Sequence, residues 1–280
     1  MAEPELLLAK ATHKIAAQDM PGLEQTLQEW QDAAGLDDDS LRQINWVQHP
    51  LYTILKEAVK QDSPDAVGLL MTKFTDVQKL VASLSIQHDA PNTLSLIVAR
   101  GFDVEEEITD QIPSLLAEAT KSPRAFLWLL EHGADPMKKA RRGKTVLDIV
   151  AQSASPEMVQ QVLDYGGRPN ECYALHAACR WRTSKRLEVI KMLVNEYGAN
   201  NVNVLEFEHD PVNFELCRNS PLGTPLHYAA RFGPADAVRL LLAKGADKNV
   251  LDSVGKTAMA WADRGYIRPR AENIALLRES

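Results

Sequence analysis

Three arginines, each beside or near an aromatic residue, recur at the same place in successive stretches of the chain. The first two follow His176 and His227 by four residues, and the third is found by aligning Thr257 with Thr224. A guanidinium group presents a planar fork of donors that suits carboxylates and phosphates, and it also stacks on aromatic rings. This pattern predicts a groove that binds an acidic or aromatic-containing ligand. The groove residues are Arg180, Trp181, Arg231, Phe232, Arg264 and Tyr266.

An insertion separates the first two of these stretches. His176 and His227 lie 51 residues apart, 18 more than the period of 33 residues that other parts of the chain show. Most of the extra residues fall in 202–221, a segment too apolar for a plain linker, so we expect it to cover the groove or to pack on a neighbouring repeat. The lid residues that we expect are Phe207, His209 and Phe214.

The lid and the arginine row also permit an alternative, in which the groove is catalytic. His209 and Arg231 would be the reacting groups, because general acid–base chemistry needs little more than one titratable side chain held next to the substrate. Such an enzyme would be a cofactor-free isomerase or cyclase. The chain has no glycine-rich phosphate loop, no His-Glu-x-x-His motif and no nucleophile elbow. We therefore predict binding rather than catalysis, with no catalytic residue and no cofactor.

The cysteines predict no metal site and indicate a reducing compartment. They are Cys172, Cys179 and Cys217, and their spacing fits no metal-binding pattern. Cys179 holds a position that a later repeat fills with Ala230, so we interpret it as a small core residue. Cys217 adjoins Arg218 in the insertion, which gives it the cationic neighbour that a reactive thiol needs.

Glycines at regular intervals indicate the elements that must position these residues. Gly101, Gly133, Gly166 and Gly198 are spaced by 32, 33 and 32 residues, and Gly245 follows after 47 residues because of the insertion. Each glycine comes just after an apolar run, where a helix should end in the left-handed conformation that glycine adopts at little cost. A repeat of this length predicts pairs of helices that must stack on one another to bury their apolar faces.

The stretch from Gly223 to Asn249 resembles the ankyrin repeat over nearly its whole length. It begins with Gly-Thr-Pro-Leu-His and later contains Leu-Leu-Ala-Lys-Gly-Ala-Asp. The resemblance implies that His227, and His176 in a looser motif, are structural residues that tie adjacent repeats together. It also implies that the end of each first helix lines the concave groove in which proteins of this family usually bind ligands and partners. Upstream the match weakens, and Asp148 stands in the histidine position.

We therefore predict an all-α, ankyrin-like repeat solenoid, in which stacked helix-turn-helix units are joined by short hairpin loops. Residues 1–48 are expected to form an N-terminal helical cap, with helices at 5–17 and 21–33. Residues 49–280 are expected to form the repeats. The boundaries within them are 49–111 for degenerate repeats, 112–250 for clear repeats with the insertion at 202–221, and 251–280 for a capping repeat.

Charge is distributed unevenly along the chain. Residues 1–140 hold 12 Lys and Arg against 22 Asp and Glu, whereas residues 141–280 hold 19 against 16, and 13 of those 19 are arginine. An arginine-rich C-terminal groove favours an acidic partner. Nucleic acid is not expected, because the net charge is -7 and the basic residues are not densely clustered.

The predicted function is that of a protein-recognition module, a scaffold or adaptor, that binds its partner through the C-terminal concave groove. An acidic small molecule is the alternative ligand. No stretch is apolar enough to span a membrane, and Glu3 and Glu5 stand where a signal peptide would carry positive charge. We accordingly expect a soluble protein of the cytoplasm, with the nucleus as the alternative location, and no membrane partner.

Overall fold

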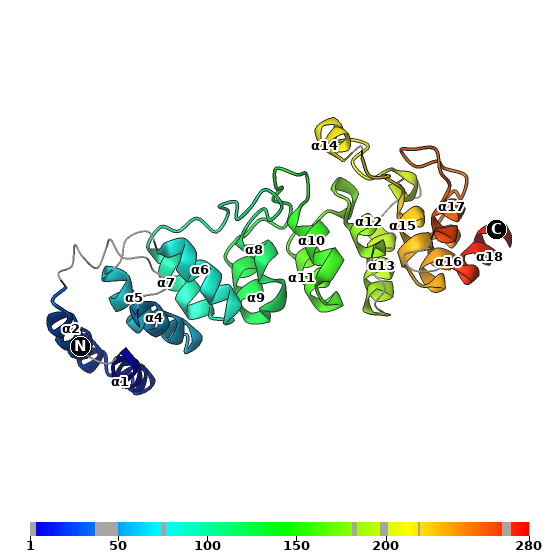
Figure 1. Cartoon of the computed structure of the whole chain (residues 1–280). Coiled ribbons are helices and arrows are strands. Elements are labelled where there is room, and N and C mark those ends of the chain that lie inside the picture. Colours follow the sequence, from blue (N-terminus) through cyan, green and yellow to red (C-terminus); the bar gives the residue numbers. More distant parts are fainter. Residues whose placement is uncertain are drawn as a thin grey trace. The chain divides into compact units, whose positions relative to one another are not determined.

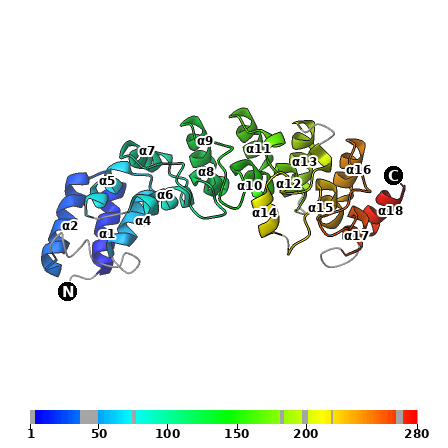
Figure 2. The same cartoon turned by 90° about the horizontal axis from the view of Figure 1, so that it is seen from above.

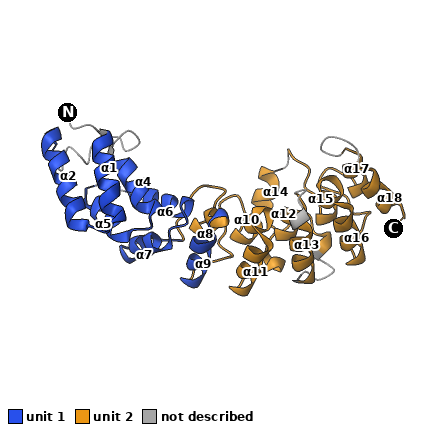
Figure 3. Ribbon diagram, turned by 90° about the horizontal axis from the view of Figure 1, so that it is seen from below, with its two compact units in different colours: residues 1–104, 121–132 blue, residues 105–120, 133–280 orange. Residues whose placement is uncertain are grey.

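All regular secondary structure is helical in the residues that the computed structural model describes (Figure 1). These residues are 4–36, 50–73, 77–180, 184–196, 201–217, 219–264 and 270–279. Within those ranges there are no strands, only two isolated β-bridges, Thr109 with Ile112 and Lys139 with Thr145. The predicted all-α class is therefore confirmed. The chain divides into two compact units, residues 1–104 with 121–132 and residues 105–120 with 133–280 (Figure 3).

Unit 1 is built from antiparallel helix pairs. The helices are α1 (Pro4–Ala16), α2 (Met20–Ala34), α4 (Pro50–Lys60), α5 (Pro64–Thr72), α6 (Gln78–Gln87), α7 (Pro91–Ala99) and α9 (Pro123–Glu131). Helix α1 packs on α2 and also on α4, just as α4 packs on α5 and also on α6. The two helices expected in the N-terminal cap thus form one more pair of the same kind. The rest of the predicted cap, residues 1–3 and 37–48, lies outside the described residues.

In unit 1, an aspartate just after one helix caps the start of a helix further along the chain. Asp62 follows α4 and caps α7, and Asp89 follows α6 and caps α9. The Asp62 carboxylate accepts hydrogen bonds from the backbone N–H of Thr93 at 2.9 Å and of Asn92 at 3.3 Å, at the start of α7. In the same way the Asp89 carboxylate accepts from the N–H of Ala125 at 2.8 Å, at the start of α9. Each bond satisfies a helix N–H group that has no partner within its own helix. Neighbouring pairs are therefore joined by polar contacts as well as by their apolar faces.

Unit 2 contains the C-terminal repeats. Its helices are α8 (Leu115–Glu118), α10 (Val146–Ser153), α11 (Pro156–Asp164), η3 (Pro169–Glu171), α12 (Ala174–Cys179), α13 (Ser184–Glu196), η4 (Asn201–Asn203), α14 (Pro211–Leu216), α15 (Pro225–Phe232), α16 (Ala235–Ala243), α17 (Ala258–Asp263) and α18 (Ala271–Glu279); η2 (Ala119–Lys121) lies at the division of the two units. Figure 2 shows the second helices α11, α13 and α16 in one row and the first helices α10, α12 and α15 in another. Helix α14 lies on the side of the first helices.

The insertion enlarges the tip of one hairpin. In the last repeat the hairpin is closed by a hydrogen bond from the Asp252 N–H to the Lys256 carbonyl, 2.8 Å long. The corresponding bond of the preceding repeat joins the Glu206 N–H to the Gly223 carbonyl at 3.1 Å. Residues 207–222 therefore stand where the last repeat has three residues. The hydrogen-bonded base of the hairpin is kept, and the extra chain leaves from its tip.

The start of α14 packs on an earlier hairpin of unit 2. Gly143, at the tip of that hairpin, has φ +75°, and a Cβ atom there would come within 2.6 Å of Asn213 Nδ2 and 2.9 Å of Asp210 Oδ2. Lys139 of the same hairpin has its Nζ 3.9 Å from Asp210 Oδ2. Only glycine combines this backbone conformation with room for the insertion. The insertion thus contacts the hairpin before α10, which belongs to the repeat two before its own.

The caps of unit 1 can be tested at Asp89. Asp89→Ala removes the acceptor for the α9 N–H and places a Cβ-bearing residue without local hydrogen bonding at φ 54°. We expect it to lower the free energy of unfolding by roughly 2 kcal/mol. Asp89→Asn keeps a side-chain oxygen and tolerates the left-handed conformation, so it should cost much less. Urea unfolding followed by far-ultraviolet circular dichroism measures both, and equal losses in the two variants would contradict the capping role.

Candidate functional site

In three of the C-terminal repeats, one side chain of the first helix hydrogen-bonds to the backbone of the next hairpin. The three bonds run from His227 Nε2–H to the Lys256 carbonyl (3.0 Å), from His176 Nε2–H to the Val204 carbonyl (2.8 Å) and from the Tyr173 N–H to Asp148 Oδ1 (2.8 Å). All three side chains are buried. Each bond joins one repeat to the following one, and aspartate at position 148 does so as well as histidine does.

The two histidines differ in their second ring nitrogen. His227 Nδ1 accepts a hydrogen bond from the Thr224 N–H at 3.1 Å and lies 2.9 Å from the Thr224 hydroxyl oxygen. Tyr173 stands at the position corresponding to Thr224, and His176 Nδ1 is buried with no hydrogen-bond partner among the described residues. Burial lowers the pKa of His176 to about 4, although the carboxylate of Glu206 opposes this shift. His176 is therefore neutral near pH 7, with its proton on Nε2.

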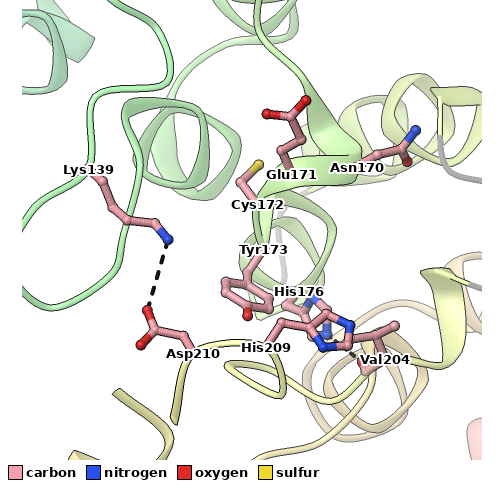
Figure 4. A pocket seen from close by; sticks show the side chains of 9 residues that line it. All are labelled: Lys139, Asn170, Glu171, Cys172, Tyr173, His176, Val204, His209 and Asp210. Atoms are coloured by element: carbon pink, nitrogen blue, oxygen red, sulfur yellow. Dashed lines mark hydrogen bonds and ion pairs between the residues drawn. The ribbon is translucent and has the colours of Figure 1, made fainter. Parts of the chain in front are cut away.

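A pocket of about 220 Å³ lies beside His176, where the insertion meets the start of α12 (Figure 4). It is lined by Lys139, Asn170, Glu171, Cys172, Tyr173, His176, Val204, His209 and Asp210. Burial raises the pKa of Tyr173 to about 12, against a hydrogen bond from the His209 backbone, so its hydroxyl stays protonated. The pocket is smaller than most cavities that bind small molecules, which measure roughly 300–1,000 Å³.

The three expected lid residues have different environments. Phe207 is buried, and its ring lies edge-on to that of Tyr173 with 5.1 Å between centroids. Phe214 is half-buried on α14, and His209 is exposed at the pocket of Figure 4. Arg231, the other residue of the catalytic alternative, is not among the residues that line this pocket.

Arg180 forms a polar cluster with Glu206 and Tyr228. Its guanidinium is ion-paired with the Glu206 carboxylate, donates to the Tyr228 hydroxyl at 2.9 Å, and lies 4.3 Å from the centroid of the Tyr228 ring. The Tyr228 hydroxyl in turn donates to Glu206 at 2.6 Å. The side chain of Glu206 is 5% exposed and that of Arg180 33% exposed. Arg180 therefore meets a carboxylate that belongs to the hairpin of the next repeat.

Arg231 occupies the equivalent position one repeat later, but its charge has no such partner. Its guanidinium carbon lies 5.1 Å from the centroid of the Phe232 ring and 5.7 Å from that of Trp261. Its Nε atom is buried and, within the described part of the chain, has no hydrogen-bond partner, and no ion pair forms there either. The residue is half-buried. Arg231 thus presents a stacked guanidinium that can accept an anion.

The other residues predicted to line the groove lie at or near helix ends, where the structure describes them. Phe232 is half-buried at the end of α15, and Arg264 is exposed directly after α17. Trp181 and Tyr266 lie outside the described residues. Arg180, Arg231 and Arg264 thus come at the ends of α12, α15 and α17, the three first helices in which the sequence placed them.

Several residues around these arginines were not predicted from the sequence. Glu206, Tyr228 and Trp261 contact Arg180 or Arg231, and Asp252 accepts a hydrogen bond from the Trp261 indole. Two of them had a signal in the alignment, because Tyr228 follows Thr224 by four residues as Trp261 follows Thr257. The two carboxylates had none, since the insertion separates Glu206 from the helix that it contacts.

Family models for ankyrin repeats match two adjoining parts of the chain. One, described as three copies of the repeat, matches residues 114–205, and another, described as many copies, matches residues 210–262. Together they span more than half of the 280 residues. The chain belongs to the ankyrin repeat family. The ankyrin-like solenoid predicted from the sequence is therefore confirmed.

Two solved structures are similar to this ankyrin repeat chain. The ankyrin repeat domain of Bcl-3, described as a unique member of the IkappaB protein family, is 20% identical, with 96% of this chain and 97% of that chain covered and a TM-score of 0.45. A chain of the complex between the predatory endopeptidase Bd0816 from Bdellovibrio bacteriovorus and the immunity protein Bd3460 is 15% identical, with coverage of 74% and 98% and a TM-score of 0.51. The second match supports the fold alone. The comparison with curated proteins gave no match.

The described ranges of this ankyrin repeat chain contain neither a membrane-spanning helix nor a cluster of metal ligands. None of their helices has the length and apolar character needed to cross a membrane. No group of three or more histidine, cysteine, aspartate or glutamate side chains there is arranged to hold a metal ion. Cys172 and Cys179 are buried and form no disulfide, and burial raises the pKa of both thiols.

The burial of His176 makes stability depend on pH. Its pKa is about 4 in the folded chain and about 6.5 when unfolded, so the unfolded state binds the extra proton between these values. The contribution of His176 to the free energy of unfolding should be fully present above pH 6.5. It should fall between pH 6.5 and pH 4, by up to about 1.4 kcal/mol per pH unit. His176→Gln, which keeps a donor for the Val204 carbonyl, should flatten that slope in urea titrations. The buried His227, whose pKa is also lowered by burial, leaves a residual slope of the same sign.

The Arg180 cluster can be tested at Glu206. Glu206→Gln leaves an acceptor for the Tyr228 hydroxyl but removes the charge that faces Arg180, so we expect a loss of about 2 kcal/mol in the free energy of unfolding. Glu171→Gln is the matched control, because Glu171 forms an exposed ion pair with Arg168 at 2.8 Å that should contribute little. Midpoints from urea unfolding compare the two, and a larger loss in the control would refute a stabilising role for the cluster.

Proposed function

We propose that this ankyrin repeat chain is a protein-recognition module, a scaffold or adaptor, which binds an acidic or aromatic-containing partner through its C-terminal concave groove. The groove residues are Arg180, Trp181, Arg231, Phe232, Arg264 and Tyr266. Family membership supports recognition as the general function, since stacked repeats offer an extended surface that such proteins use for binding.

The unpaired guanidinium of Arg231, on a half-buried residue, is the observation that carries this proposal. It stacks near Phe232 and Trp261, and no carboxylate among the described residues pairs with it. A cation held against aromatic rings is typical of the residues that contribute most to binding at protein interfaces. Because the rings restrict its movement, the guanidinium loses little side-chain entropy when it binds an anion.

The catalytic alternative has less support. It needs His209 and Arg231 to act on one ligand, yet His209 lines a pocket that does not include Arg231. An acidic small molecule at Arg231 remains the alternative ligand. Nucleic acid is disfavoured by the net charge of -7.

Capture from an extract of the source organism tests the proposed function. Tagged wild-type protein should retain a polypeptide partner, and Arg231→Gln should reduce its recovery by about tenfold, because the stacked cation is lost while the fold is kept. Quantitative mass spectrometry of polypeptides and small molecules in the same eluates gives the measurement.

A matched control is available within the same repeat. Arg239 lies on α16, is exposed, and pairs with Asp236 at 2.8 Å and Glu272 at 2.9 Å. Arg239→Gln should leave recovery of the partner unchanged. Equal recovery with wild type and Arg231→Gln would refute the groove assignment, and a small molecule retained without any polypeptide would favour the alternative ligand.

A further inference from the structure

Two successive repeats place an arginine against an aromatic ring of the following repeat. Arg180 lies over Tyr228, with 4.3 Å from its guanidinium carbon to the ring centroid, and Arg231 lies near Trp261 at 5.7 Å. Tyr228 and Trp261 hold the same position, four residues after the N-cap threonines of α15 and α17. The stack therefore builds the same arginine–aromatic arrangement twice.

A carboxylate from the hairpin also meets the aromatic residue in both repeats. Glu206 and Asp252 correspond, because each donates its backbone N–H to the residue just before the N-cap threonine. The Tyr228 hydroxyl donates to Glu206 at 2.6 Å, and the Trp261 indole N–H donates to Asp252 Oδ2 at 2.6 Å. The two sites therefore share an arginine, an aromatic side chain and a hairpin carboxylate at equivalent positions.

The sites differ in whether that carboxylate also reaches the arginine. Glu206 pairs with Arg180, but no ion pair joins Asp252 to Arg231. Asp252 has one methylene fewer, and its Oδ1 accepts from the N–H groups of Val254 at 2.9 Å and Lys256 at 2.7 Å in its own turn. The aspartate is therefore held in the hairpin and does not pair with Arg231. The Nε atoms of both arginines are buried without a hydrogen-bond partner among the described residues, so the two sites differ in the ion pair alone.

We propose that Arg231 forms a carboxylate subsite, in which an Asp or Glu side chain of a partner polypeptide takes the place that Glu206 takes at Arg180. This inference rests on the proposed function. The equivalent site at Arg180 shows which anion this arrangement accepts, because the carboxylate of Glu206 is bound there. A charge-assisted hydrogen bond to a partly buried guanidinium is stronger than one to a freely hydrated cation. A doubly charged phosphate is disfavoured by the Asp252 carboxylate on the same indole ring.

The subsite can be tested with displayed peptides. A library of short random peptides is selected on the full chain, and the strongest binders are synthesised with each Asp or Glu changed in turn to Asn or Gln. Dissociation constants are measured by calorimetry against wild type, Arg231→Gln, Arg231→Lys and the control Arg239→Gln. Circular dichroism verifies that every variant is folded.

One acidic residue of the peptide should depend on Arg231. Changing this residue to Asn or Gln should weaken the binding of the peptide to wild type and to Arg239→Gln by about tenfold or more. The same change should weaken its binding to Arg231→Gln by less than about twofold. Arg231→Lys, which keeps the charge but not the planar fork, should show an intermediate effect.

The outcomes separate the subsite from the proposed function. If Arg231→Gln weakens binding but no acidic residue is coupled to it, the carboxylate subsite is wrong and groove recognition stands. If the acid-to-amide changes cost the same on wild type and Arg231→Gln, the carboxylate binds elsewhere and the subsite is again wrong. If no peptide is selected, or if binding ignores Arg231, both proposals fail.

Discussion

The hydrogen bond from the first helix of one repeat to the backbone of the next hairpin fixes the geometry on which the candidate site depends. Helices α12 and α15 are six and eight residues long, too short to be stable alone, so their positions are set by neighbouring repeats. His176 and His227 each anchor such a helix to the following hairpin at about 3 Å. This register brings an arginine of one repeat onto an aromatic ring of the next.

The insertion changes the chemistry of the groove without changing that register. It leaves from the tip of a hairpin whose base is intact, and it contacts two earlier repeats. Phe207 packs against Tyr173 at the start of α12, and Asp210 approaches Gly143 in the hairpin before α10. At the hairpin base stands Glu206, which neutralises Arg180. The same backbone position in the next repeat holds Asp252, which is retained by its own turn. A difference of one methylene thus leaves one arginine paired and the next available.

Much of the helical framework could be predicted from the sequence, because both the apolar periodicity of a helix and the residues that end it are local features. The cap helices expected at 5–17 and 21–33 correspond to α1 and α2 within one residue at each end. Repetition then placed Arg180, Arg231 and Arg264 at equivalent helix ends. The environment of these arginines could not be predicted, because Glu206 lies 26 residues from Arg180 in sequence and reaches it only through the folded hairpin.

The sequence by itself determined the repeat, the all-α class and the row of equivalent positions, since each depends on patterns within about one repeat length. The tertiary structure decided which positions share a contact. It decided that His176 Nδ1 has no partner among the described residues, because Tyr173 replaces the N-cap threonine, and that the pocket beside His209 does not include Arg231. It also decided which arginine is paired with a carboxylate, because ion pairing depends on distances between side chains of different repeats, and the sequence of a single repeat does not specify these distances.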